Sequence, residues 1–202
     1  MKKNILTMIM SSLVIVSWAF GQNKVHVDQI DWSKIKTIHF DIYFIKGEEE
    51  FGQKLVLMAE EAYYYLQSKF NIPLRDKIPL IVYHTHLDFQ KTNIIDPLLN
   101  EAVGGFTESL KNRVVVPFNG SYLELEEVLI HELTHAYING ITYESASSRI
   151  LGLTGGRFPF WFSEGLPEFN SIGGTNVYNE MIMMDMVING YMPQMENLDG
   201  YF

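Results

Sequence analysis

The chain has 202 residues and a formal net charge of -9, because 24 Asp and Glu residues outnumber 15 Lys and Arg residues. This acidic balance argues against a nucleic-acid partner, which would require a basic surface to displace counterions from phosphates. The chain has no cysteine, so disulfide bonds, thiolate metal ligands and a cysteine nucleophile are excluded. With 47% hydrophobic residues, the chain can bury the core of a folded domain.

Residues 1–21 have the layout of a signal peptide. Two lysines precede an uncharged apolar run over residues 5–20, and Ala19 and Gly21 supply small side chains at the cleavage positions. An uncleaved membrane anchor is the alternative, since the run is close to the short end of a membrane span. No later segment is long and apolar enough to span a membrane, so we expect an exported protein, periplasmic or secreted.

The first half of the remaining chain predicts two strands and a helix. Residues 37–45 and 78–86 are rich in β-branched and aromatic residues, which is typical of strands. Residues 48–70 begin with three glutamates, favourable at a helix N-terminus, and continue with apolar residues at helical spacing. This predicted helix should end before Pro73.

A short extended piece at Gly104 and Gly105 and a strand over 113–118 come next, joined by a turn. Ser121 then opens a predicted helix, because Ser121 and Glu124 have the spacing of a capping box.

Gly140 is expected to end that helix in the left-handed conformation. A Gly-rich loop at 152–156 and helices near 161–170 and 180–189 complete the pattern. The order of elements favours an α+β fold with a helical C-terminal part.

The helix opening at Ser121 contains His131-Glu132-Leu133-Thr134-His135, an H-E-x-x-H motif. Two histidines four residues apart share one helix face, so both can bind the same metal ion. Glu132 lies about 100° around the helix from His131, where it can take a proton from water instead of binding the metal. Catalytic Zn2+ has three protein ligands and one open position, so a third ligand is needed.

The third ligand is suggested by a resemblance. The W-x-x-E-G-x-x-E segment Trp161–Glu168, together with the upstream motif, resembles the gluzincin (thermolysin-like) zinc metallopeptidases. This resemblance implies that Glu164 is the third zinc ligand, beside the two histidines, and that Glu132 is the general base. It also implies that Glu168 orients a ligand histidine; an ordinary solvated acid is the alternative.

The same resemblance predicts a zincin-like fold, in which a small mixed sheet places an edge strand over the active-site helix. Residues 37–135 are similar to secreted bacterial peptidase domains, some of which precede a TolB-type β-propeller. We therefore expect residues 22–202 to form a metallopeptidase domain whose C-terminal part is short for this family and is a candidate truncation. A C-terminal β-propeller in a longer protein is the expected partner domain. An extended peptide or protein substrate would add to the edge strand at Gly104–Thr107, where Gly105 and Phe106 would bind it, or to the 113–118 strand; ordinary sheet structure is the alternative.

The chain departs from the family in two places. Pro167 stands inside the segment that carries Glu164, so the helix there should either start late, near Ser163, or bend. Gluzincins also commonly place a later Tyr or His against the oxyanion. Tyr178, Tyr191 and Tyr201 are available for this role, and their spacing selects none of them.

The leading prediction is a zinc metallopeptidase that hydrolyses peptide bonds with Glu132 as general base. One alternative is a catalytically silent zinc-binding module for binding or assembly in the cell envelope, and another is an α+β scaffold without metal. His84 and His86, placed on one face of a predicted strand, are a weaker candidate metal pair. The methionines over 181–186 are expected to pack in a core or against a following segment; an adaptable pocket is the alternative.

Overall fold

The computed structural model describes residues 30–95, 99–142, 158–194 and 197–198. The predicted signal peptide (1–21), the Gly-rich loop (152–156) and Tyr201 lie outside these residues. None of the helices in the described ranges has the length and apolar character needed to cross a membrane.

A five-stranded mixed sheet forms the centre of the molecule, with the strand order β1-β2-β3-β5-β4. Its strands are β1 (Trp32–Lys36), β2 (Phe40–Ile45), β3 (Ile78–Tyr83), β4 (Phe106–Glu108) and β5 (Arg113–Pro117). The three central strands β2, β3 and β5 run parallel, and the two edge strands β1 and β4 pair antiparallel with their neighbours. β4 is thus an edge strand.

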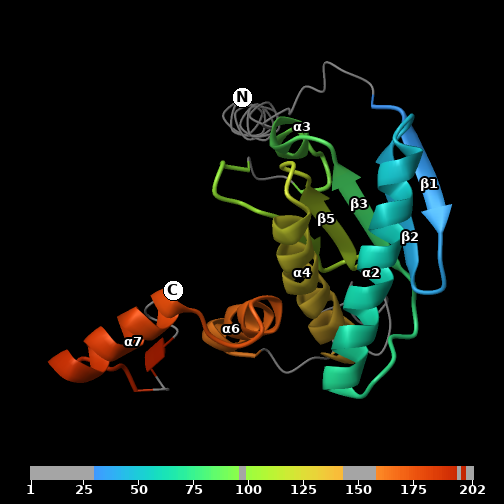
Figure 1. Cartoon of the computed structure of the whole chain (residues 1–202). Helices are drawn as coiled ribbons and strands as arrows, with labels where there is room; N and C mark the ends of the chain where they lie inside the picture. The colour runs from blue at the N-terminus through green and yellow to red at the C-terminus, as the bar shows by residue number, and fades with distance from the viewer. Residues whose placement is uncertain (1–29, 96–98, 143–157, 195–196, 199–202) are drawn as a thin grey trace, which may run out of the picture.

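Five helices in the described residues accompany the sheet. They are α2 (Glu49–Phe70), α3 (His86–Gln90), α4 (Tyr122–Thr142), α6 (Phe160–Ser171) and α7 (Val177–Asn189). α2 and α4 lie side by side on one face of the sheet, α6 lies beside α4, and α7 lies farther out (Figure 1). The predicted α+β class and the helical C-terminal part are confirmed.

The core lies between the sheet and the helices α2 and α4. Alternate residues of β2, namely Phe40, Ile42 and Phe44, are buried on the face that meets these helices. Leu129 and Leu133 of α4 are buried in the same cluster, and each large apolar side chain contributes about 1.5–3 kcal/mol when fully buried. Because this side of α4 is committed to the core, its other side is available for a functional site.

The strand predicted over 37–45 is present as β2, but it begins only at Phe40 and is the second strand of a hairpin. β1 precedes it, and the chain turns at Thr37, whose N–H donates to the carbonyl of Phe40 over 2.9 Å. The prediction missed β1, because three of its five residues are Ser or Lys and none of the five is buried.

The strand predicted over 78–86 is too long. β3 ends at Tyr83, and the Thr85 hydroxyl accepts a hydrogen bond from the Asp88 N–H over 3.1 Å, which starts the helix α3. His84 therefore pairs with Glu48, its Nδ1 lying 2.9 Å from a carboxylate oxygen. His86 instead places Nε2 3.0 Å from the carbonyl oxygen of Val103. The prediction that both histidines share one strand face is wrong.

The helix α4 begins as predicted but ends later. The Ser121 hydroxyl accepts a hydrogen bond from the Glu124 N–H over 3.3 Å, whereas the Glu124 carboxylate bonds the Asn119 side chain. Gly140 lies inside the helix rather than at its end, which corrects the prediction. A Cβ at Gly140 would stand 2.5 Å from Leu74 Cδ2, so glycine here accommodates close packing.

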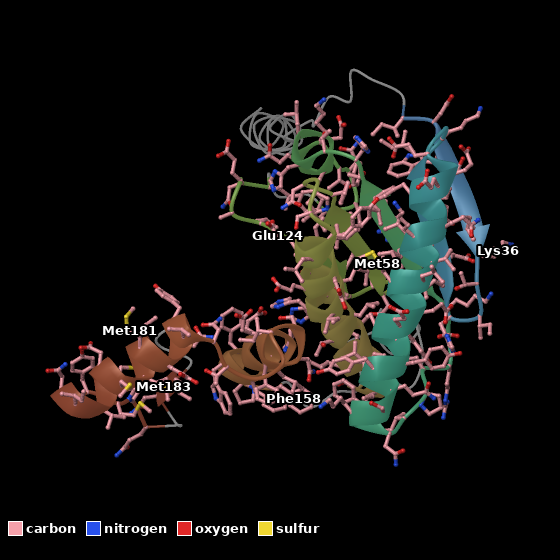
Figure 2. The ribbon with its side chains drawn as sticks, in the orientation of Figure 1. Lys36, Met58, Glu124, Phe158, Met181 and Met183 are labelled. Atoms are coloured by element: carbon pink, nitrogen blue, oxygen red, sulfur yellow. The ribbon has the colours of Figure 1, made fainter. Side chains whose placement is uncertain are left out.

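The helix predicted near 161–170 is present as α6, which begins at Phe160 and continues through the buried Pro167, so the alternative of a late start near Ser163 is wrong. α7 is helical as predicted, but none of its residues is buried. Figure 2 shows Met181 and Met183 on α7, away from the sheet and its two covering helices. The prediction that these methionines pack in a core is therefore wrong within the described residues.

Candidate metal centre

Two helices bring three potential metal ligands together. His131 and His135 lie on α4, and Glu164 lies on α6. One donor atom from each of the three residues lies within 4.8 Å of the other two. The three side chains are partly exposed, so an ion can reach them from solvent.

A buried hydrogen bond ties α6 to the motif itself. Asn170, 5% exposed, donates from Nδ2 to the hydroxyl of Thr134 over 3.4 Å. Thr134 is fully buried, and its hydroxyl in turn donates to the Ile130 carbonyl over 2.8 Å. The Tyr65 hydroxyl of α2 donates to the Asn170 carbonyl over 3.3 Å. These contacts hold the helix that carries Glu164 against the helix that carries the histidines.

The donor set suits zinc. Two imidazole nitrogens and one carboxylate oxygen match a known set of catalytic zinc ligands, with one position left open. His135 Nε2 and Glu164 Oε2 are 3.7 Å apart. Ligand atoms at about 2.0–2.2 Å from a tetrahedral ion stand about 3.3–3.6 Å from each other, so this pair is already near the required spacing.

Glu168 lies one helical turn after Glu164, beside the other histidine. Its Oε2 is 3.7 Å from Nδ1 of His131, which is within ion-pair range but longer than a hydrogen bond. A carboxylate in this place can orient the imidazole ring and increase its basicity. The structure thus places Glu168 beside His131, one of the two predicted ligand histidines.

Glu132 is the buried acid of the centre, with only 6% of its surface exposed. The Thr107 hydroxyl lies 2.8 Å from its Oε2 and 2.7 Å from its main-chain oxygen. Burial raises the pKa of Glu132 to about 7; the Thr107 hydrogen bond opposes this increase and the nearby Glu164 charge adds to it. A carboxylate with a pKa near neutrality is suited to accept and then release a proton.

Both histidines are held in the form that binds metals. Burial lowers the pKa of His131, and the neighbouring His135 lowers it further, against the opposing charges of Glu168 and Glu164. Burial also lowers the pKa of His135. Each imidazole is therefore neutral at neutral pH, with a lone pair available for an ion.

The centre opens into a cleft of about 830 Å³. The predicted substrate residues Gly105 and Phe106 line it together with Glu132 and both histidines. A Cβ at Gly105 would lie 3.0 Å from Glu132 Cγ, so a larger residue here would require the acid to move by a few tenths of an ångström.

Sequence reasoning gave no individual role to Thr107 or Asn176, two polar residues that line this cleft. Thr107 stands two positions after Gly105, and residues with this spacing lie on the same face of an extended chain. This spacing was the signal in the sequence that could have placed Thr107 in the cleft. Asn176 lines the cleft from the N-terminus of α7, where its side chain accepts a hydrogen bond from the Asn179 N–H over 2.9 Å. Neither Tyr178 nor Tyr191 is among the described residues that line the cleft.

From the raised pKa of Glu132 we predict how the stability of the metal-free protein depends on pH. The pKa of Glu132 in the folded protein, about 7, exceeds the ordinary value of 4.5. The protonated acid therefore contributes stability that is fully present below pH 4.5 and is lost as the pH rises through 7. Glu132→Gln removes this loss and should stabilise the protein at pH 8 by about 3 kcal/mol, with little gain at pH 4.5. Urea unfolding at both pH values measures the difference, and the exposed Glu126→Gln is the control. An equal gain at both pH values would contradict the burial argument.

The case for a metal centre rests on the geometry of its side chains. No protein-family model and no curated protein matches this chain. The centre is thus defined by the donor triad of His131, His135 and Glu164, the buried Glu132 beside it, and the cleft that gives access to both.

Proposed function

We propose that this protein is an exported, zinc-dependent metallopeptidase with a zincin-like fold of the gluzincin type. One observation carries the proposal: His131, His135 and Glu164 converge from two helices beside the buried acid Glu132, in one open cleft. A structural zinc site has no need of a buried acid next to its ligands, whereas in hydrolysis by activated water such an acid can serve as general base.

Glu132 performs the proton transfers of the proposed reaction. Zinc, when bound by the triad, would polarise the substrate carbonyl and make a water molecule more acidic. The Glu132 carboxylate takes a proton from the attacking water and later gives it to the nitrogen of the leaving amine. Glu168 keeps the His131 ring oriented throughout.

The edge strand β4 is suited to hold the substrate. It pairs with β5 along one side, and no described strand pairs with its other side. An extended peptide added there would run past Gly105 and Phe106, which line the cleft. Main-chain hydrogen bonds to the strand would place the scissile carbonyl beside Glu132.

Charge in the cleft predicts a preference among substrates. Four of the described residues that line the cleft are glutamates, namely Glu127, Glu132, Glu164 and Glu168. None of the described lining residues is Lys or Arg. The helices α4, α6 and α7 contain no Lys or Arg at all. Peptides with Lys beside the cleaved bond should therefore have kcat/KM values at least about 10-fold above matched Glu peptides at low salt.

Peptide pairs that differ only in Lys or Glu, assayed at two ionic strengths, test this preference. Salt should reduce the difference, because screening weakens interactions between exposed charges. Glu127→Gln removes a glutamate outside the triad and should reduce the preference several-fold. A preference for the Glu peptides, or one insensitive to salt, would contradict the electrostatic explanation.

A silent zinc-binding module of the cell envelope is the second candidate. It is favoured by the composition of the cleft, where no described Tyr, and no His outside the triad, stands ready to bind an oxyanion. Elemental analysis combined with a peptide library separates the two. The proposed enzyme binds one zinc per chain and cleaves library members, and a chelator abolishes cleavage. Stoichiometric zinc without cleavage would favour the silent module, and absence of zinc would reject both.

A further inference from the structure

Thr107 of the edge strand β4 holds Glu132 of α4 by two contacts. Its Oγ1 lies 2.8 Å from Glu132 Oε2 and 2.7 Å from the main-chain oxygen of the same residue. A glutamate side chain has three rotatable bonds, and fixing its terminal oxygen relative to its own backbone leaves few rotamers. The contact therefore sets the direction of the carboxylate as well as its distance from β4.

The chain just before β4 supports the same side chain at its middle. A Cβ at Gly105 would stand 3.0 Å from Glu132 Cγ and 3.1 Å from side-chain atoms of Val116 and Val128. Gly105 and Thr107 are two residues apart, the spacing that places residues on one face of an extended chain. Glu132 is thus enclosed at Cγ and hydrogen-bonded at Oε2 by the same segment.

The hydroxyl also suits an acid that must gain and lose a proton. A hydroxyl donates one hydrogen bond and accepts two, whereas a carbonyl oxygen and an ionised carboxylate only accept. When Glu132 is ionised, Thr107 can donate to Oε2. When Glu132 is protonated, Thr107 can accept from Oε2 and donate to the main-chain oxygen. A rotation of one O–H bond therefore provides a hydrogen bond to the acid in both states.

We propose that Thr107 is the positioning residue of the general base, orienting the Glu132 carboxylate toward the centre for both proton transfers. This inference rests on the proposed function, but the orientation itself is a structural property. A purely structural role, in which Thr107 only fastens β4 to α4, predicts loss of stability without a specific effect on the carboxylate. The two roles therefore require separate measurements.

Three variants separate these roles. Thr107→Val keeps the shape and removes the hydroxyl, whereas Thr107→Ser keeps the hydroxyl. Thr37→Val is the matched control, because it removes a hydroxyl that accepts from the Phe40 N–H over 2.9 Å in the turn between β1 and β2, at the opposite edge of the sheet. Each zinc-loaded variant is crystallised, its zinc affinity is measured by chelator competition, and kcat and KM are measured with a cleaved peptide.

Thr107→Val should lower kcat by about 10–100-fold, with KM and zinc affinity within about twofold of wild type. Thr107→Ser and Thr37→Val should keep kcat within about threefold. In the crystals, the Glu132 carboxylate should keep one rotamer in wild type and Thr107→Ser but not in Thr107→Val.

An unchanged Glu132 rotamer in Thr107→Val would overturn the inference, whether or not the protein cleaves peptides. Equal kcat losses in the Val and Ser variants, or a loss of zinc affinity parallel to kcat, would also overturn it. If wild type and Glu132→Gln are equally inactive while the rotamer responds as expected, the proposed function fails and the positioning contact stands.

Discussion

Replacing Glu132 with Gln should lower peptide hydrolysis by about 10²–10⁴-fold while the protein still binds one zinc ion. Gln has nearly the shape of Glu and can still interact with the Thr107 hydroxyl, but it cannot accept a proton from water. The acid is 6% exposed and lines the cleft beside the donor triad, so no described carboxylate outside the triad is as closely enclosed there. The measurement is kcat/KM with a cleaved peptide, together with zinc content.

The control for this variant lies on the same helix. Glu126→Gln makes the same chemical change at an exposed position of α4 that does not line the cleft, and it should leave hydrolysis unchanged. If Glu132→Gln kept full activity at full zinc occupancy, Glu132 would not be the general base. If it lost its zinc as well as its activity, the assay would instead report damage to the metal centre.

His135→Ala should remove most of the stabilisation that zinc gives the wild-type protein. An ion that binds only the folded state stabilises it by about 4 kcal/mol at a concentration 1,000-fold above Kd. Removing one of three ligands should weaken binding by more than the 10–100-fold typical of an orienting residue, so most of this stabilisation is lost. Thermal unfolding with and without zinc measures the effect.

Other variants give a predicted order for the same assay. Glu164→Gln should lose most of the stabilisation by zinc, as His135→Ala does. Glu168→Gln should weaken zinc binding by about 10–100-fold, because the Glu168 carboxylate lies beside His131 and outside the triad. His84→Ala should behave as wild type, since His84 pairs with Glu48 outside the cleft. A zinc effect that survived His135→Ala but not His84→Ala would place the ion elsewhere.

The part of the centre that the sequence predicts best is the part fixed by local geometry. His131 and His135 are one helical turn apart, so any helix through them places both imidazoles on one side. Glu164 comes from a separate helix, and only the resemblance suggested it. Its approach to the histidines depends on tertiary contacts such as the buried bond between Asn170 and Thr134. No periodicity in the sequence encodes that contact.

The errors in the fold arise where a short-range signal competes with tertiary packing. Gly140 has the appearance of a helix end, but it is kept small by the approach of Leu74 within the helix. Thr85 and Asp88 have the spacing of a helix cap, a local signal for α3 that the apolar run of the preceding strand obscured. The period-two spacing places Thr107 on the same face as Gly105 but does not reveal its role, because its contact with Glu132 depends on how β4 lies over α4.

The central claim is that the triad and Glu132 hydrolyse peptide bonds with the help of zinc. Mass spectrometry of a peptide library incubated with the zinc-loaded protein in H₂¹⁸O tests it most directly. We predict new C-termini that carry one ¹⁸O atom, lost when zinc is chelated and restored when zinc is added back. Failure of the zinc-loaded protein to generate new C-termini, or cleavage that continues unchanged after zinc is removed, would contradict the account.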